Sequence, residues 1–372
     1  MDSAQQKEAL AAARLAIDET DAALLDLLSR RAALSLEIGR IKKADAENPM
    51  PVYDPARESE LLNRLAALNK GPLSAGQIKT IWSEILSASR ALQHPIHAAY
   101  LGPEGTFSHH AALGFLGGSA LFVPCADFEE IFLRVTDGSC EYGVIPLENS
   151  LRGTVGQNFD LFRRYDVSIQ AEFMSRISHC LLSRENDLAA VRTIYSHPQA
   201  LAQCARWLHR NCTGAGIAPV ESTAAAAHRA AKESNSAAIG HSALAGNNGL
   251  HVLAEAIEDN AGNYTRFVLI APRNGATLPP SKAGKTSLMF TLPDKAGALS
   301  HVLKILADGN VNLLKLESRP IEGSPWQYVF FADAEGAVSK QTLEALRPAC
   351  LSLRMLGCYP SSTLPEGKAG TA

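Results

Sequence analysis

The chain has 372 residues, which is too long for one ordinary hydrophobic core and suits about two or three domains. Apolar residues make up 46% and charged residues 20%, which excludes collagen-like, intrinsically disordered and disulfide-scaffold proteins. With 35 basic and 38 acidic residues the net charge is -3, so we expect neither nucleic acid nor a membrane as a partner.

The seven cysteines are odd in number and never form a C-x-x-C pair. This pattern indicates reduced thiols and predicts neither a disulfide framework nor a zinc site. The N-terminal segment has acidic residues where a secretory signal needs a basic and then an apolar run. No long uncharged stretch follows. We therefore expect a soluble cytoplasmic protein.

The first predicted helix, from about residue 7 to 43, has a cation where its pattern demands an apolar residue. Arg31 continues a series of apolar positions spaced by seven, and a buried charge is costly unless it is paired. Lys42 lies roughly 16 Å further along the same face, so both cations could bind one small dianion. Arg14 is roughly 42 Å from Lys42 and could join them only from an antiparallel partner helix. Alternatively, Arg14 and Lys42 are solvated, and Arg31 extends past its neighbours to solvent or pairs with an acid. The series comprises Leu10, Ile17, Leu24 and Ile38.

Two further helices complete a predicted all-α domain over residues 1–95. One begins at Pro55 behind an Asp54 N-cap and stops near residue 71. The other begins after a Ser74-x-x-Gln77 pattern typical of a capping box and ends near residue 93. Polar side chains gather at the start of the second helix and on one face of the third: Asp54, Arg57, Glu58, Ser89 and Gln93.

Residues 98–272 predict an α/β domain, because short β-rich runs alternate with helical patterns. The expected strands include AAYLG, ALFVP, YGVIP, VSIQAEF, TIYSH, AAIG and TRFVLI. Residues 273–284, rich in Pro, Gly and Ser, predict a linker. Residues 285–362 follow the order βαββαβ, which predicts a ferredoxin-like α+β domain, and residues 363–372 predict a mobile tail.

The helical region resembles the AroQ-type chorismate mutase family through R-x-x-I-D-E-x-D, S-R-R, G-R-x-K, V-Y-D-P-x-R-E and S-A-S-R-A-L-Q. The resemblance implies an intertwined homodimer, in which Arg14 of one chain completes the other chain's site. It implies rearrangement of chorismate to prephenate, which needs no nucleophile, metal or cofactor. Arg14, Arg31 and Arg57 would hold the substrate carboxylates. Lys42 and Gln93 would address the ether oxygen, and Asp54, Glu58 and Ser89 would fix the hydroxyl and the pose.

The central region resembles the prephenate dehydratase family through GPEGTFSHHAA, GVIPLENSLRGTV, SHPQALAQC, ESTAAAA and NYTRF. Taken one at a time, these are ordinary turns between strands and helices. The resemblance implies two α/β lobes around a cleft, as in type 2 periplasmic binding proteins, with the second lobe over residues 175–250. It places Thr265 as proton donor, Arg266 on a carboxylate and Phe267 in the lining.

Other polar residues of these motifs could donate hydrogen bonds to substrate oxyanions: Thr106, Asn149, Ser150, Thr154, Ser196, Gln199, Ser222 and Thr223. Each could equally cap its own helix. His109 and His110 are expected at the surface or at a helix start.

The C-terminal region resembles the ACT domain of prephenate dehydratases. The motifs that carry the resemblance are Gly297-Ala298-Leu299, Asn312 and Glu317-Ser318-Arg319-Pro320, and they imply a phenylalanine pocket at a subunit interface. Ala296 stands where the family commonly has proline.

Together the three regions resemble the bifunctional chorismate mutase/prephenate dehydratase (P-protein) family. Two alternatives remain at this stage: an arogenate dehydratase in the central domain, or a non-catalytic ligand-binding regulator.

Overall fold

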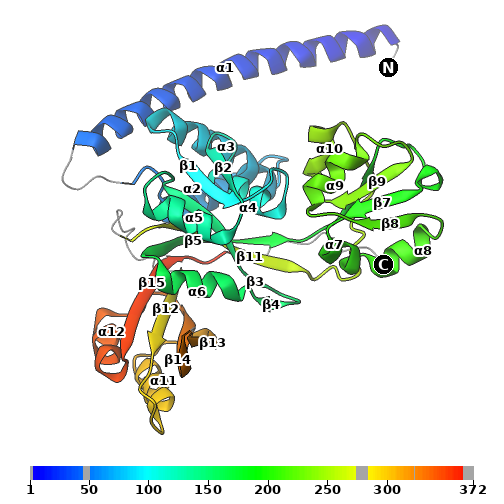
Figure 1. Ribbon diagram of the computed structural model, residues 1–372. Coiled ribbons are helices and arrows are strands. Elements are labelled where there is room, and N and C mark those ends of the chain that lie inside the picture. Colours follow the sequence, from blue (N-terminus) through cyan, green and yellow to red (C-terminus); the bar gives the residue numbers. More distant parts are fainter. Residues whose placement is uncertain (1–2, 45–50, 274–283, 322, 363–372) are drawn as a thin grey trace.

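The computed structural model describes residues 3–44, 51–273, 284–321 and 323–362. Most of the predicted linker and the whole predicted tail lie outside the described residues. The described chain forms a helical region, a two-lobed α/β domain and a C-terminal α+β domain (Figure 1). The predicted fold classes of all three regions are therefore confirmed.

The helical region contains α1 (Ser3–Ala44), α2 (Pro55–Leu68) and α3 (Ala75–Gln93). The Asp54 carboxylate accepts a hydrogen bond from the Arg57 backbone N–H, and Ser74 and Gln77 form both bonds of a capping box, as predicted. Near its C-terminal end α1 packs closely on α3, because a Cβ at Gly39 would lie 3.0 Å from Cγ of Gln93. No described helix combines the length and the apolar run that a membrane span requires.

Most of α1 extends away from the rest of the molecule (Figure 1). Its seam is exposed over the whole length, with Leu10 at 51%, Leu24 at 51% and Leu34 at 60% exposed. A long helix normally buries such a stripe against a partner. The other exposed apolar side chains of α1 are Leu15, Ile17, Leu25, Leu27, Leu28, Leu36, Ile38 and Ile41.

The first lobe of the central domain is a mixed sheet in the order β2-β1-β3-β11-β5, with β4 paired to β3. The helices α4, α5 and α6 pack against it, and Ile145 and Val268 lie in its core without exposed surface. Its strands are β1 (His97–Leu101), β2 (Leu121–Cys125), β3 (Tyr142–Asn149), β4 (Gly153–Thr154), β5 (Val167–Arg176) and β11 (Tyr264–Pro272). The helices span Phe107–Leu116, Phe128–Thr136 and Gly156–Arg164.

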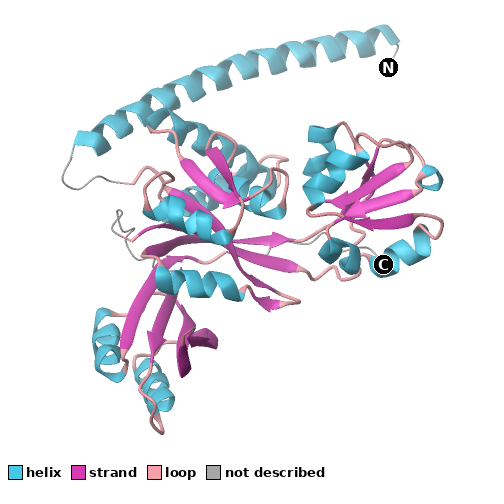
Figure 2. Ribbon diagram, in the orientation of Figure 1, coloured by secondary structure: helices cyan, strands magenta, loops and turns pink. Residues whose placement is uncertain are grey.

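The second lobe is a five-stranded sheet in the order β10-β6-β9-β7-β8. The chain enters it after β5 and returns to the first lobe through β11, so two crossings join the lobes (Figure 2). The strands are β6 (Cys180–Ser183), β7 (Thr193–Ser196), β8 (Gly216–Pro219), β9 (Ser236–Gly240) and β10 (His251–Ala254). The helices are η1 (Leu188–Ala190), α7 (Pro198–Gln203), α8 (Ala205–Asn211), α9 (Thr223–Ala230) and α10 (Ala243–Asn248).

The C-terminal domain has the predicted βαββαβ order and an antiparallel sheet in the order β13-β14-β12-β15. Its elements are β12 (Gly284–Thr291), α11 (Ala298–Asp308), β13 (Leu313–Ile321), β14 (Ser324–Glu335), α12 (Lys340–Leu346), η2 (Arg347–Ala349) and β15 (Ser352–Pro360). Strand β15 lies against β5 of the first lobe. A Cβ at Gly357 would lie 2.1 Å from the Ile169 carbonyl oxygen, so the close approach of the two domains requires glycine there.

Candidate active sites

The helical region contains a cavity of about 610 Å³ that collects most of the predicted mutase residues. Its lining includes Arg31 and Lys42 from α1, and Ser89 and Gln93 from α3. The start of α2 adds the remaining three: Asp54, Arg57 and Glu58. This volume is in the usual range for a small-molecule site. With Arg90 of α3, which also lines the cavity, four cations and two acids surround one space.

Both α1 cations are half-buried at this cavity. Arg31 donates a hydrogen bond to the Ser89 hydroxyl, and Lys42 Nζ lies 2.6 Å from the Pro51 carbonyl oxygen. Burial lowers the pKa of both side chains. Lys42 is therefore not simply solvated, whereas Arg14 is exposed on the extended part of α1 in the single chain.

Gln93 has an unpaired polar atom at the cavity. Its Nε2 donates to the Ser89 carbonyl oxygen at 3.3 Å, and its buried Oε1 has no partner among the described residues. An ether oxygen accepts hydrogen bonds, which Lys42 and the second N–H of the Gln93 amide could donate.

Glu58 is already paired, and its partner was not predicted from the sequence. Nη1 of Arg90 donates to the Glu58 carboxylate, with 2.5 Å to Oε2, and the Arg90 side chain is 5% exposed. Burial raises the pKa of Glu58, and the Arg90 charge opposes that rise. Glu58 therefore faces the cavity as a fixed group.

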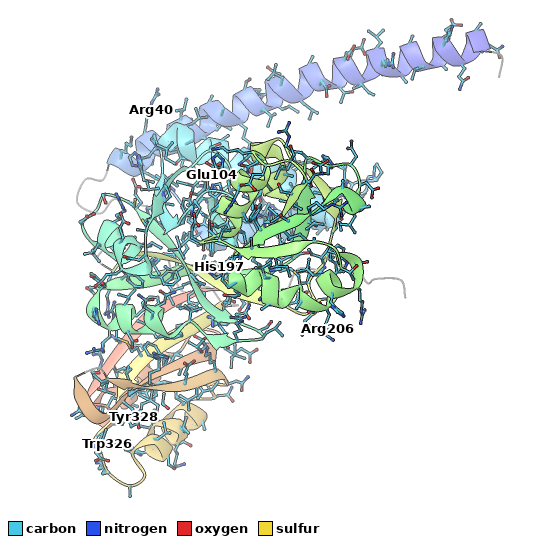
Figure 3. The ribbon with its side chains drawn as sticks, turned by 45° about the vertical axis from the view of Figure 1, so that its right-hand side comes forward. Arg40, Glu104, His197, Arg206, Trp326 and Tyr328 are labelled. Carbon is cyan, nitrogen blue, oxygen red and sulfur yellow. The ribbon has the colours of Figure 1, made fainter. Side chains whose placement is uncertain are left out.

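A second cavity, of about 430 Å³, lies between the two lobes of the central domain. Thr106, Asn149, Thr265 and Phe267 line it from the first lobe, as predicted. From the second lobe the predicted residues are Gln199, Ser222 and Thr223. The lining also contains His179, His197 and Gln203, which the sequence did not single out. His197, labelled in Figure 3, is the N-cap of α7.

Thr265 is oriented by Asn149. Strand pairing sets the two residues opposite one another, and the Asn149 amide donates to the Thr265 hydroxyl oxygen at 3.0 Å. The same amide lies 2.7 Å from the Asn263 side-chain oxygen, while Asn149 Oδ1 accepts from the Leu151 backbone N–H. Because the Thr265 oxygen accepts this bond, its own O–H is available to donate elsewhere, and hydrogen bonds in series strengthen one another.

Four helices of at least eight residues begin at the second cavity, and two of them have a capping hydroxyl in its lining. Thr106 is the N-cap of α4 and Ser222 is the N-cap of α9. Unpaired backbone N–H groups and the helix dipole make such ends favourable for anions. No Arg or Lys is among the described residues that line the cavity. A carboxylate would therefore be held there by neutral donors and helix ends.

Three predicted cavity residues lie elsewhere. Ser196 has no exposed surface and donates to the Ile239 carbonyl oxygen. Ser150 donates to the Gly262 carbonyl oxygen and accepts from the Tyr264 backbone N–H, next to the paired ends of β3 and β11. Thr154 donates to Glu317 of the C-terminal domain. Their hydroxyls form local hydrogen bonds and none of the three lines the cavity.

Arg266 was predicted to bind a substrate carboxylate in the cleft, but it lies on the other face of the sheet. Neighbouring residues of a strand point to opposite faces. Thr265 and Phe267 face the cavity, whereas Arg266 is buried and donates to Glu172 at 2.8 Å, to Asp333 and to the Tyr359 hydroxyl at 2.8 Å. Lys285 pairs with Glu172 at 2.9 Å. Burial opposes ionisation of Asp333, but Arg266 and its other donors outweigh it and lower its pKa. Arg266 therefore joins the central domain to the C-terminal domain.

The predicted regulatory residues occupy two places in the C-terminal domain. Gly297, with φ of +81°, precedes Ala298 and Leu299 at the start of α11, and Asn312 lines a separate hollow with Glu335. Along β13 Ser318 is exposed, while Glu317 and Arg319 contact the central domain. Arg319 pairs with Asp160 at 3.3 Å.

His109 and His110 are at the start of α4, as predicted, and both side chains are half-buried. His109 Nδ1 accepts from the Gly105 backbone N–H, and its ring lies 5.0 Å from that of Tyr100. His110 lies 4.5 Å from the ring of His241. Burial lowers the pKa of His109, of His110 and, to about 4, of His241. None of the described residues forms a cluster suited to a metal ion.

The chain matches three family profiles in order. These are chorismate mutase type II over residues 13–94, prephenate dehydratase over residues 98–275 and the ACT domain over residues 286–350. A bifunctional chorismate mutase/prephenate dehydratase of Aquifex aeolicus is 37% identical over 367 residues, covering 96% of this chain and 100% of that relative.

Two solved structures resemble the central and C-terminal domains. One is a prephenate dehydratase from Arthrobacter aurescens in complex with L-Phe, with 31% identity, a TM-score of 0.65 and coverage of 73% of this chain and 93% of that chain. The other is described as a quorum-quenching acylase of a novel type, with 31% identity, a TM-score of 0.65 and coverage of 72% and 98%. Identity of more than one third with the Aquifex enzyme over nearly the full length shows that the chain belongs to the bifunctional chorismate mutase/prephenate dehydratase family.

Proposed function

We propose that the chain rearranges chorismate to prephenate in the helical cavity and converts prephenate to phenylpyruvate in the cleft between the lobes. The observation that carries the proposal is the presence of two separate cavities with different chemistry. The first is lined by Arg31, Lys42 and Arg57, and the second contains the Asn149-oriented hydroxyl of Thr265. Family membership supports both activities.

The helical cavity suits a reaction without covalent catalysis. Arg31 and Arg57 hold the substrate carboxylates and favour a compact conformer, while Lys42 and Gln93 stabilise the charge that develops on the ether oxygen as its C–O bond breaks. Asp54, Glu58 and Ser89 fix the substrate hydroxyl and the pose. The electrons move within the substrate, so these residues need only to position it and donate hydrogen bonds.

The complete mutase site requires a second chain. Arg14 lies about 25 Å along α1 from Arg31, which is too far to share one small ligand within a chain. An antiparallel α1 from a second copy would bring its Arg14 to the cavity and would cover the exposed seam of Leu10, Leu24 and Leu34. The proposed assembly is therefore an intertwined homodimer.

In the cleft, Thr265 donates its proton to the ring hydroxyl of prephenate, which leaves as water. The C–C bond between the ring and its carboxylate breaks and carbon dioxide departs. The electron pair of that bond enters the ring, which becomes aromatic. Solvent returns one proton to Thr265, so the reaction consumes one proton for each carbon dioxide and water released. The ends of α4 and α9, together with Gln199 and Thr223, hold the side-chain carboxylate.

The C-terminal domain is proposed to bind phenylalanine and to regulate the dehydratase. The Phe complex of the Arthrobacter relative supports this ligand, and the proposed residues are Gly297, Ala298, Leu299, Asn312, Glu317, Ser318 and Arg319. A coupling of about 1 to 3 kcal/mol would suffice for regulation. The proposed domains are 1–95, 98–272 and 285–362, joined by a linker at 273–284. The scarcity and spacing of the cysteines support a cytoplasmic location.

A product assay on chorismate, with and without phenylalanine, tests all three modules. Formation of phenylpyruvate that phenylalanine alters supports the proposal, and absence of chorismate loss would favour a non-catalytic regulator. Arogenate carries an amino group where prephenate has a keto oxygen. Competition between the two substrates distinguishes a prephenate dehydratase from an arogenate dehydratase.

A further inference from the structure

Arg90 connects the helical cavity to the central domain. Its guanidinium donates to Glu58 on one side and, at 2.6 Å, to the Leu116 carbonyl oxygen at the end of α4 on the other. The same group lies 5.0 Å from the centre of the Tyr53 ring, and the Arg90 side chain is 5% exposed. One buried cation thus contacts an acid of the first cavity and the main chain of the second enzyme.

The Leu116–Ser119 turn, which accepts the Arg90 hydrogen bond, is also hydrogen-bonded to other residues of α3. Ser87 donates to the Leu116 carbonyl oxygen at 2.7 Å and accepts from the Ser119 backbone N–H at 3.0 Å. The Gly118 N–H donates to the Glu84 carboxylate at 3.1 Å. Gly117 has φ of +67°, and a Cβ there would lie 2.5 Å from that of Ser87, so the close fit depends on glycine. The Leu116–Ser119 turn is therefore a fixed anchor.

Glu58 depends on this anchor for its charge and its place. The carboxylate is largely buried, and burial raises its pKa. Arg90 opposes that rise through its charge and its hydrogen bonds. Loss of the guanidinium would leave a buried carboxylate without this partner, which would then remain protonated to a higher pH.

We propose that Arg90 is a positioning residue for the mutase reaction, which links Glu58 to the Leu116–Ser119 turn so that the dehydratase domain holds one wall of the mutase site in place. The inference rests on the proposed mutase function of the helical cavity. It makes the mutase site depend on the dehydratase domain and not the reverse, because none of the described residues of the helical region lines the cleft between the lobes.

The test uses full-length Arg90→Met, Arg90→Lys, Glu58→Gln and the Arg90→Met/Glu58→Gln double variant. Arg64→Met, an exposed arginine on the same helix as Glu58, is the matched control. Chorismate loss and prephenate dehydration are measured on each preparation over a range of pH. Arg90→Met is expected to lower mutase kcat/KM by about tenfold or more and to move the acid limb of its pH profile upward. Dehydratase kcat/KM stays unchanged.

The double variant shows whether Arg90 acts through Glu58. We expect Arg90→Met to cause no further loss in the Glu58→Gln background. Three results would overturn the proposal. The acid limb of the mutase pH profile could stay unchanged in Arg90→Met, or Arg90→Met could cause the same loss of mutase activity in the Glu58→Gln background as in the wild type. Arg90→Met could also lower mutase and dehydratase activity equally. If Arg90→Met does not fold, Arg90→Lys decides, because lysine keeps the charge but cannot bridge both partners; an unchanged mutase profile in that variant would also overturn it.

Failure of the proposed mutase function gives a different result. Wild-type protein would then leave chorismate intact while its stability and dehydratase activity remain measurable. The role of Arg90 is tested only by changes relative to an active wild type. Failure of the Arg90 proposal is therefore distinguishable from failure of the proposed mutase function.

Discussion

Replacement of Arg266 by methionine distinguishes a domain-joining role from a substrate-binding role. The Arg266 side chain is 6% exposed, and its partners Glu172 and Asp333 are 0% and 11% exposed. Breaking a buried ion pair by removing one partner costs about 3 to 5 kcal/mol. Lys285 still pairs with Glu172 after the change, so we expect a loss near the lower limit, about 3 kcal/mol.

The assay is urea unfolding of the full chain together with prephenate kinetics. We expect a lower unfolding midpoint for the central and C-terminal domains, and a KM for prephenate that changes little in protein that remains folded. Arg134→Met removes a partly exposed pair with Glu130 within one helix and is the control, expected to change the midpoint far less. A large rise in KM with unchanged stability would refute the reasoning, because it would return Arg266 to the substrate carboxylate.

Three further predictions concern single side chains. Lys42→Ala should lower mutase kcat far more than it destabilises the fold, and unchanged turnover would exclude its role at the ether oxygen. Thr265→Ala should abolish phenylpyruvate formation from prephenate while chorismate loss continues at the wild-type rate; retained dehydratase turnover would remove the assignment. Burial, with His110 and His179 nearby, lowers the pKa of His241 to about 4, below its unfolded value of 6.5. The unfolded state therefore binds the proton first, and stability should fall as the pH drops from about 6.5 to about 4. His241→Asn should flatten urea midpoints in that range, and an equally steep dependence would contradict the explanation.

The elements with local signals were predicted well from the sequence. Asp54 and the Ser74–Gln77 pair mark helix starts through hydrogen bonds within one turn, so nothing distant is needed to recognise them. Strands β6, β8 and β10 were missed. They have four residues each, as does β7, which was predicted, so their strand structure depends more on neighbours in the sheet than on length.

The site predictions failed where a side chain's direction or a distant partner decides its role. Strand alternation alone could have separated Arg266 from Thr265 and Phe267. Ser196 lies on the same kind of strand end as Asn149, yet its hydroxyl bonds inward to Ile239, which the sequence does not reveal.

Arg90 stands between two predicted site residues, Ser89 and Gln93, but gave no signal of its own. Its acceptor is a main-chain carbonyl at Leu116, in another domain, and backbone acceptors leave no trace in residue type. Such contacts become visible only in the folded chain.

Mixing Arg14→Ala with Lys42→Ala tests the two-chain mutase site most directly. Each variant alone should lack mutase activity and retain dehydratase activity. After the two are unfolded together and refolded, random pairing makes half of the dimers mixed, and each mixed dimer has one intact site. Mutase activity should then recover to about a quarter of the wild-type value. No recovery, in a preparation whose dehydratase activity has returned, would contradict a site completed by Arg14 of a second chain.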